Sequence, residues 1–178
     1  LRYAWSETGI RMAVKAVLWS NDAEAGVARC GACAHACRIG EGGAGFCRVR
    51  INRGGVLYSL SADSLAAVNL DPVEKKPLYH FLPGTATLSL GTPGCNMTCA
   101  FCQNHALSQG KVPAITETAE TLPEAFVRRI LDAAGESGAA SVSFTYNEPC
   151  VSPELLLAVA PRALEAGLPT LLVANAYD

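Results

Sequence analysis

Seven of the eight cysteines in this 178-residue chain fall into two short clusters. The second cluster has the spacing C-x3-C-x2-C and consists of Cys95, Cys99 and Cys102. Structural zinc sites and simple ferredoxin clusters use four protein ligands. Three thiolates on an iron–sulfur cubane would therefore leave one iron open to a small molecule, which predicts chemistry rather than a purely structural role. The alternative is a zinc site that His105 or Cys150 completes, although neither gives a standard spacing.

The first cluster offers four thiolates, those of Cys30, Cys33, Cys37 and Cys47, at the spacing C-x2-C-x3-C-x9-C. Four soft ligands suit a closed tetrahedral zinc site. An auxiliary iron–sulfur cluster would also use four cysteines. We favour zinc or another structural metal, but spacing does not separate the two alternatives. His35 lies between two of these cysteines, and we expect it to donate a hydrogen bond rather than to bind the metal.

Composition argues against other uses of the cysteines. Eight in 178 residues is fewer than in a disulfide-rich scaffold, and tight spacing suits metal binding better than long-range cross-links. We expect neither a secretory leader nor a membrane span, since the longest apolar run, 155–160, is too short to cross a bilayer. A net charge of −2 offers no basic field for nucleic acid or an anionic membrane. We therefore expect a cytoplasmic protein whose reduced thiols can bind metal.

Strands and helices alternate in the part of the chain that contains the second cluster. We expect strands at 85–91, 140–146 and 168–174, with helices between Thr121 and Gly138 and between Ser152 and Gly167. In the first of these helices, Thr121 is the expected N-cap of a capping box. Such alternation predicts an α/β fold with a parallel sheet, in which ligands bind at the carboxyl ends of the strands.

Candidate polar residues follow each of these strands. Cys95 follows the first strand, Asn147 and Glu148 follow the second, and Asn175 follows the third. The carboxyl ends of parallel strands lie at one edge of the sheet, so we expect these side chains to lie close together.

The N-terminal part of the chain has weaker patterns. Residues 30–50 hold too few apolar side chains to fold without a metal. We expect a hairpin at 48–60 and, because of three prolines, an ordered loop at 61–84. The predicted division is a lead-in (1–29), a Cys-rich metal-binding region with the hairpin (30–60), a connecting loop (61–84) and a core (85–178).

The second cluster, with Phe101 before its last cysteine, resembles the motif of the radical S-adenosylmethionine (radical SAM) superfamily. The resemblance implies that Cys95, Cys99 and Cys102 hold three irons of a [4Fe–4S] cluster, while S-adenosylmethionine chelates the fourth. It implies reductive cleavage of S-adenosylmethionine to a 5′-deoxyadenosyl radical that abstracts hydrogen from a substrate. It also places Phe101 near the adenine.

Two further segments resemble motifs of this superfamily. The segment T-Y-N-E-P at 145–149 stands where members carry a Gly-Gly-Glu-Pro-like segment, which implies that Asn147 and Glu148 contact the methionyl amino group. An ordinary turn with a solvated Glu148 is the alternative. Asn175 matches the Thr-Asn-Gly motif of glycyl-radical activases, although Ala176 replaces the glycine.

Residues 30–177 resemble the radical SAM enzyme of the AmmeMemoRadiSam system, which is similar to pyruvate formate-lyase activating enzyme. The resemblance rests on the four cysteines before the radical SAM motif and on the segment DPVEKKPLYHFLPG at 71–84. It implies AMMECR1-like and Memo-like partners and an electron donor of the flavodoxin or ferredoxin type. In that segment Lys75, Lys76 and His80 are candidate cleft residues, with a solvated lysine pair and a core histidine as the alternatives.

The resemblance further implies that residues 85–178 form the front half of a partial (βα)6 TIM-like barrel. A full eight-stranded α/β barrel takes roughly 250 residues and does not fit this chain. Residues 85–178 hold only the first three expected strands, whereas the resemblance implies a core of about six βα units, so we expect that residues 1–178 alone do not turn over. Three functions stay open: a radical SAM enzyme with an unidentified substrate, a glycyl-radical enzyme activase, and a non-catalytic metal-binding or electron-transfer module.

Overall fold

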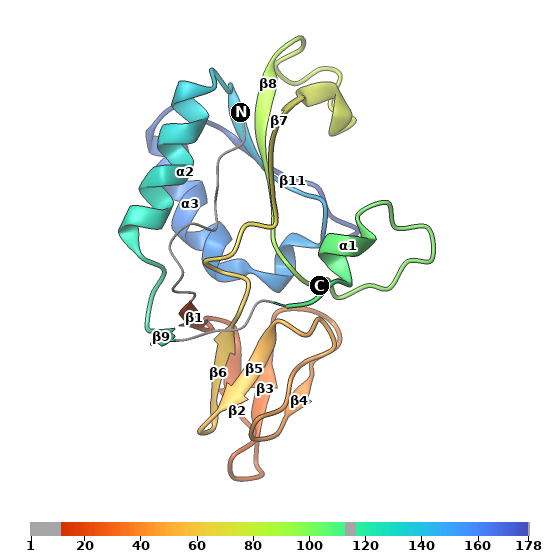
Figure 1. The fold of residues 1–178 in the computed structure, drawn as a ribbon, viewed down its shortest axis with the longest axis vertical. Coiled ribbons are helices and arrows are strands. Elements are labelled where there is room, and N and C mark those ends of the chain that lie inside the picture. The colour runs from red at the N-terminus through yellow and green to blue at the C-terminus, as the bar shows by residue number, and fades with distance from the viewer. Residues whose placement is uncertain (1–11, 113–116, 178) are drawn as a thin grey trace.

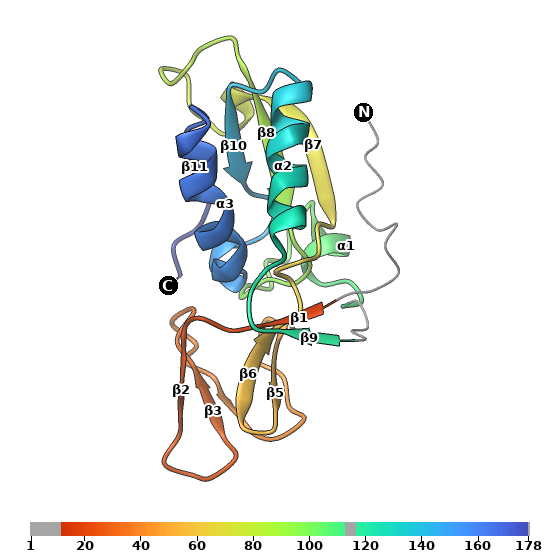
Figure 2. The same cartoon turned by 90° about the vertical axis from the view of Figure 1, so that its left-hand side faces the viewer.

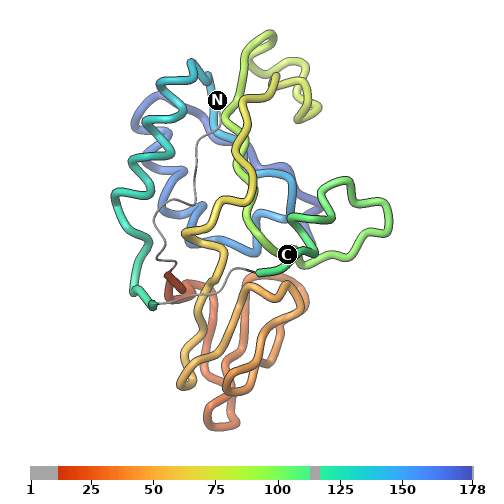
Figure 3. The backbone as a smooth tube through the Cα atoms, viewed as in Figure 1, coloured from red at the N-terminus to blue at the C-terminus, as the bar shows by residue number. Residues whose placement is uncertain are grey.

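The computed structural model describes residues 12–112 and 117–177, which form two lobes stacked along the long axis (Figure 1). We call residues 12–60 the N-terminal lobe, and residues 61–112 and 120–177 the C-terminal lobe. The chain passes between the lobes after residue 60 and returns to the N-terminal lobe once, at 117–119 (Figure 3). The N-terminal lobe thus contains the described part of the predicted lead-in as well as the Cys-rich region, and the C-terminal lobe contains 61–84 as well as the predicted core.

Two small sheets make up the N-terminal lobe. One has the order β5 (Arg50–Arg53), β6 (Val56–Ser59), β1 (Met12–Lys15) and β9 (Glu117–Ala119). The other joins β2 (Trp19–Asn21), β3 (Ala28–Cys30) and β4 (Arg38–Ile39). The antiparallel pair β5–β6 is the predicted hairpin, and it turns on Gly54 and Gly55, which both have positive φ. Strand β9 is not indicated by the sequence pattern.

The sheet of the C-terminal lobe has the order β11 (Thr170–Leu172), β10 (Ser141–Phe144), β8 (Ala86–Gly91) and β7 (Ala67–Pro72). Strands β8, β10 and β11 are parallel, which confirms the three predicted strands and their direction. Helices α2 (Glu124–Glu136) and α3 (Pro153–Glu165) cover one face of this sheet (Figure 2). The described residues close no barrel, and β11 and β7 form the two edges.

The expectation of a loop at 61–84 was wrong. This stretch contains β7, which pairs antiparallel with β8 along six residues, and the 3-10 helix η1 (Val73–Lys75). Pro72 is the last residue of β7, and an edge strand tolerates proline because one row of its N–H groups has no partner strand. Pro72 therefore ends the strand rather than excludes it, while Pro77 and Pro83 lie beyond it.

The predicted capping box at Thr121 was also wrong. Helix α2 begins at Glu124 with Pro123 at the N-cap, and no side chain caps it. Helix α3 begins at Pro153 as expected, although the Ser152 side chain makes no capping hydrogen bond. None of the helices in the described ranges is both long and apolar enough to cross a bilayer.

The two faces of the parallel sheet differ in chemistry. Leu88 and Leu90 of β8 pack in the apolar core with residues of α2 and α3. Alternate residues point to the other face, where Thr87 Oγ1 lies 2.6 Å from Ser143 Oγ of β10. These hydroxyl-bearing residues are buried as well, so the sheet is covered on both faces, as parallel sheets usually are.

Candidate metal and cofactor site

A cavity of about 630 Å³ opens in the C-terminal lobe. Its walls come from the segments that follow the parallel strands β8, β10 and β11, together with β7 and η1. The lining residues are Asp71, Lys75, Lys76, Cys95, Met97, Cys99, Cys102, Gln103, Asn104, Ser108, Thr145, Tyr146, Asn147, Glu148, Val173 and Asn175. Parallel strands end at the same edge of their sheet, which brings together residues that are far apart in the sequence.

All three cysteines of the second cluster line this cavity. They lie on the loop between β8 and the short helix α1 (His105–Ser108). Cys95 is 8% exposed, and burial raises the pKa of its thiol. Cys99 and Cys102 are half-buried. Within the described ranges, no three His, Cys, Asp or Glu side chains stand in a ready-made metal-binding arrangement.

Glu148 and Asn175 meet at the cavity, as the strand order predicts. The Glu148 carboxylate is buried and accepts hydrogen bonds from the Asn175 backbone N–H (2.8 Å) and from the Asn175 Nδ2 (2.7 Å). The pair joins the segment after β10 to the segment after β11. The structure therefore does not support a solvated Glu148 on an ordinary turn.

Asn147 also lines the cavity, but its amide is engaged by the cysteine loop. Its Nδ2 donates to Thr92 Oγ1 (2.9 Å) and to the Gly94 carbonyl (2.7 Å), and its Oδ1 accepts from the Thr92 N–H (3.2 Å). All these partners lie just before Cys95. Asn147 thus fixes the start of the loop on which the three cysteines lie.

Two candidates lie outside the cavity wall. Phe101 is 89% exposed, and His80 is exposed. Neither is among the lining residues, whereas Lys75 and Lys76 both are. The cavity lining therefore includes every predicted cluster and cofactor residue of the C-terminal lobe except Phe101. These residues are Cys95, Cys99, Cys102, Asn147, Glu148 and Asn175.

Sequence reasoning missed Asp71 and Tyr146, which form a hydrogen-bonded network in the cavity wall. Asp71 Oδ2 accepts from the Tyr146 hydroxyl (2.6 Å) and from Lys76 Nζ (2.9 Å), while Lys75 Nζ lies 3.2 Å from Oδ1. Lys76 Nζ is also 4.9 Å from the Tyr146 ring centroid, within the range of a cation–π contact. Lys76 is therefore buried, with a side chain only 4% exposed, whereas the Lys75 side chain is 65% exposed.

The network shifts two ionisation equilibria in opposite directions. Burial, followed by the hydrogen bond to Asp71, raises the pKa of Tyr146 to about 12. Burial also acts to raise the pKa of Asp71, but hydrogen bonds from Tyr146, Lys76 and other donors outweigh it and hold the pKa well below its usual range. At neutral pH the wall therefore contains a charged carboxylate and a neutral phenol.

The four cysteines of the first cluster lie on neighbouring segments of the N-terminal lobe sequence. Cys30 ends β3, Cys33 and Cys37 lie on the loop to β4, and Cys47 precedes β5. The Cys30 N–H donates to the Cys37 carbonyl (2.9 Å), and the Phe46 N–H donates to Cys37 Sγ (3.5 Å).

Their thiols influence one another. Burial raises the pKa of Cys47 to about 11, and the charges of Cys30 and Cys33 add to the increase. All eight cysteines lie in the described part of the chain, and none forms a disulfide. The residue types, four thiols without a disulfide, match the donor set of a structural metal, although the described side chains do not stand in a closed ligand arrangement.

His35 makes the hydrogen bond that was expected of it. Its Nε2 lies 2.9 Å from the Asn96 carbonyl, so this nitrogen donates, and its ring stacks on Phe46. Asn96 follows Cys95, and its Nδ2 also donates to Cys150 Sγ (3.3 Å). His35 therefore contacts the loop of the second cluster.

The chain is 36% identical over 152 residues to an uncharacterized protein of the archaeon Methanocaldococcus jannaschii. The match covers 84% of this chain and 43% of the archaeal protein, so the chain spans less than half the length of that relative. No protein-family model matches the chain, and no solved structure matches it.

Proposed function

We propose that this chain is part of a radical SAM enzyme and that Cys95, Cys99 and Cys102 hold its [4Fe–4S] cluster. The observation that carries the proposal is that three thiols from one loop line a cavity at the carboxyl ends of parallel strands. Three soft donors beside an open space fit a cluster that keeps one iron free for a small molecule. We propose the corresponding fold as well, the front half of a partial (βα)6 barrel.

The rest of the cavity lining fits S-adenosylmethionine. A volume of about 630 Å³ is within the range of small-molecule sites. Glu148 places a buried carboxylate there, which suits the ammonium of the methionyl group, and Asn175 orients that carboxylate. When bound together, the cluster and S-adenosylmethionine supply a one-electron cleavage that yields a 5′-deoxyadenosyl radical for hydrogen abstraction from a substrate.

The remaining cavity residues position and shield this chemistry. Asn147 holds the backbone before Cys95, and Asn104 Nδ2 donates to the Tyr146 carbonyl (3.1 Å). These contacts keep the cysteine loop against the segment that bears Glu148. In the first cluster we propose a structural metal, with zinc favoured over an auxiliary iron–sulfur cluster, because four cysteines at this spacing supply a complete tetrahedral ligand set.

The test uses the full-length protein, reconstituted anaerobically with iron and sulfide, reduced, and mixed with S-adenosylmethionine. We expect release of 5′-deoxyadenosine, measured by mass spectrometry, and its loss in Cys99→Ala. Cys150→Ser is the matched control, since Cys150 is not among the cavity-lining residues, and it should retain the activity. A protein that binds zinc alone and cleaves no S-adenosylmethionine would instead be a non-catalytic metal-binding module.

The same preparation separates two substrate classes. A glycyl radical, detected by electron paramagnetic resonance on an added partner protein, would identify an activase. Metal analysis of Cys33→Ser addresses the first cluster. Loss of one zinc with unchanged iron is expected for a structural site, whereas loss of iron and sulfide would reveal an auxiliary cluster.

A further inference from the structure

The two cysteine clusters belong to different lobes, but their loops are packed against each other. Gly94, the residue before Cys95, has a φ of +83°, and a Cβ at this position would lie 2.6 Å from Val49 Cγ1 and 2.7 Å from the Cys47 carbonyl oxygen. Only glycine fits so close an approach. The start of the second cluster therefore rests directly on the backbone at the last cysteine of the first.

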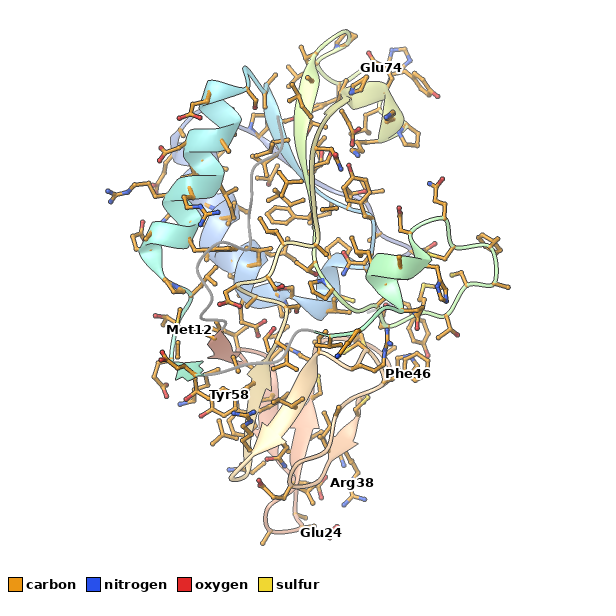
Figure 4. The ribbon with its side chains drawn as sticks, in the orientation of Figure 1. Met12, Glu24, Arg38, Phe46, Tyr58 and Glu74 are labelled. Carbon is orange, nitrogen blue, oxygen red and sulfur yellow. The ribbon has the colours of Figure 1, made fainter. Side chains whose placement is uncertain are left out.

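A second contact joins the clusters from the other side. His35, which lies between Cys33 and Cys37, hydrogen-bonds the carbonyl of Asn96. Its ring is held by Phe46, at 4.2 Å between centroids. Figure 4 shows Phe46 where the N-terminal lobe meets the C-terminal lobe, whereas Arg38 lies toward the far tip. This contact therefore also joins the first cluster, in which His35 lies, to the residue that follows Cys95.

Arg48 makes the most extensive of these contacts. Its guanidinium donates to the carbonyls of Ser108 (2.7 Å), Gln109 (2.7 Å) and Gly110 (3.3 Å). These carbonyls lie at the C-terminal end of α1, where backbone acceptors lack partners within the helix and attract a positive charge. A planar fork of donors suits this cluster of carbonyls in a way that a lysine ammonium would not.

The backbone conformation of Arg48 is also unusual, which indicates that the surrounding structure holds this residue in place. Its φ is +67°, a left-handed conformation that residues with a side chain rarely adopt. Such a conformation persists where the surroundings determine it. Cys47, a residue of the first cluster, directly precedes this turn in the chain. The Arg48 side chain extends from the turn to the helix beside the second cluster.

Helix α1, which Arg48 contacts at its C-terminal end, also contacts the cysteines of the cavity. Ser108 Oγ lies 3.4 Å from Cys102 Sγ, and the His105 N–H donates to the Cys102 carbonyl (3.2 Å). Gln109 Nε2 donates to the Met97 carbonyl (2.8 Å), which lies between Cys95 and Cys99. An arginine that fixes the end of α1 therefore fixes the loop that bears the cavity thiols.

We propose that Arg48 is a positioning residue that couples the two clusters. When the first cluster closes around its metal, Cys47 sets the Arg48 turn, and Arg48 orders the second-cluster loop through α1. The coupling rests on the metal site proposed for Cys30, Cys33, Cys37 and Cys47. It goes beyond that proposal because metal binding in the first cluster would determine how well the cysteine loop of the cavity is ordered.

The experiment measures alkylation rates of individual cysteines by mass spectrometry, in the full-length protein with and without one equivalent of zinc. In the wild type, zinc should slow alkylation of the first cluster and also slow alkylation of Cys99 and Cys102 severalfold. In Arg48→Gly the first cluster should remain protected, while the effect on Cys99 and Cys102 is lost. Glycine removes the side chain and also accepts the positive φ, so this variant keeps the turn.

Two controls make the result specific. Arg53→Ala removes an exposed arginine of β5 and should behave as the wild type does. Cys33→Ser should abolish the zinc effect on Cys99 and Cys102, and a persistent effect would show direct zinc binding there and overturn the coupling. Zinc that protects the first cluster but leaves Cys99 and Cys102 unchanged in the wild type would overturn the coupling alone. Zinc that protects neither cluster would contradict the proposed metal site as well.

Discussion

Asp71 shows how one residue organises a cavity wall. Three side chains donate to its carboxylate, those of Tyr146, Lys76 and Lys75. A buried lysine is stable in its charged form only when it is paired, and Asp71 supplies the pair for Lys76. The same carboxylate accepts the hydrogen bond of the Tyr146 hydroxyl, so the wall presents fixed polar groups to a bound molecule.

The first prediction concerns Tyr146. Replacing Asp71 with Asn removes the negative charge beside the phenol, so the pKa of Tyr146 should fall from about 12 towards its ordinary value. It should not fall completely, because burial is the larger cause of the increase. An ultraviolet titration of tyrosinate measures the change as a shift of the highest midpoint. Asn69→Ala should move that midpoint upward, since the Asn69 amide donates to the Tyr146 hydroxyl, and equal curves for all three proteins would contradict the network.

The second prediction concerns acid stability. The pKa of Asp71 is lowered by folding, so its charged form stabilises the fold above the unfolded-state pKa of about 3.9. That contribution is lost as the pH falls through the lower pKa of the folded state. The difference in unfolding free energy between the wild type and Asp71→Asn should be constant near neutral pH and shrink below about pH 4. Urea unfolding across this range measures it, and a difference that grows towards acid pH would refute the assignment.

At the scale of elements, a buried ion pair ties β5 to α3. Arg50 Nη1 lies 2.6 Å from Glu154 Oε1, with side-chain exposures of 1% and 3%. Glu154 Oε1 also accepts from the Val17 N–H (2.9 Å). Strand β5 belongs to the N-terminal lobe and α3 to the C-terminal lobe, so this pair fixes one lobe on the other.

The third prediction follows from that pair. Glu154→Ala leaves the Arg50 guanidinium buried without its partner, which costs about 3–5 kcal/mol of unfolding free energy. Glu165→Ala, on an exposed position of the same helix, should change stability by less than about 0.5 kcal/mol. The double variant Arg50→Met/Glu154→Leu should recover much of the loss, because it removes both charges. A Glu154→Ala protein as stable as the Glu165→Ala protein would show that the pair does not hold the lobes.

The sequence predicted those elements whose own residues decide their structure. The alternation of strand and helix patterns was enough to predict the three parallel strands, and the turn residues were enough to predict the hairpin β5–β6. Strand β7 was not predicted, because its structure depends on pairing with β8, which its own residues do not reveal. Pro72 also suggested a loop. Lys76 appeared to belong to a solvated run, since nothing local reveals that Asp71 and Tyr146 bury it. The place of Cys95 in the cavity wall was predictable because it follows the first parallel strand, and the carboxyl ends of such strands lie at one edge of the sheet.

At the scale of the whole molecule, the lobes differ in what holds them together. The C-terminal lobe has an extensive apolar core of leucine, isoleucine, valine and phenylalanine from the sheet and from α2 and α3. The N-terminal lobe has two smaller apolar clusters instead. One surrounds Ile39 and Leu57, and alanines and Cys30 fill most of its other places; the other surrounds Val49 and Leu60. Small cores of this kind usually need a metal or a cross-link. If the four thiols hold a metal, its binding free energy is a large part of the stability of that lobe.

The last prediction is therefore that metal removal acts on one lobe. Chelation should raise amide exchange in β3 and β4, measured by hydrogen–deuterium exchange, while β8 and β10 keep their protection because their core contains no proposed ligand. The effect should be stronger at lower pH, since the raised pKa of Cys47, about 11, makes protons strong competitors of the metal. Cys33→Ser should reproduce the exchange pattern without chelator. Uniform loss of protection in both lobes would show that the molecule unfolds as one unit, and unchanged exchange in β3 and β4 would show that no metal stabilises the N-terminal lobe.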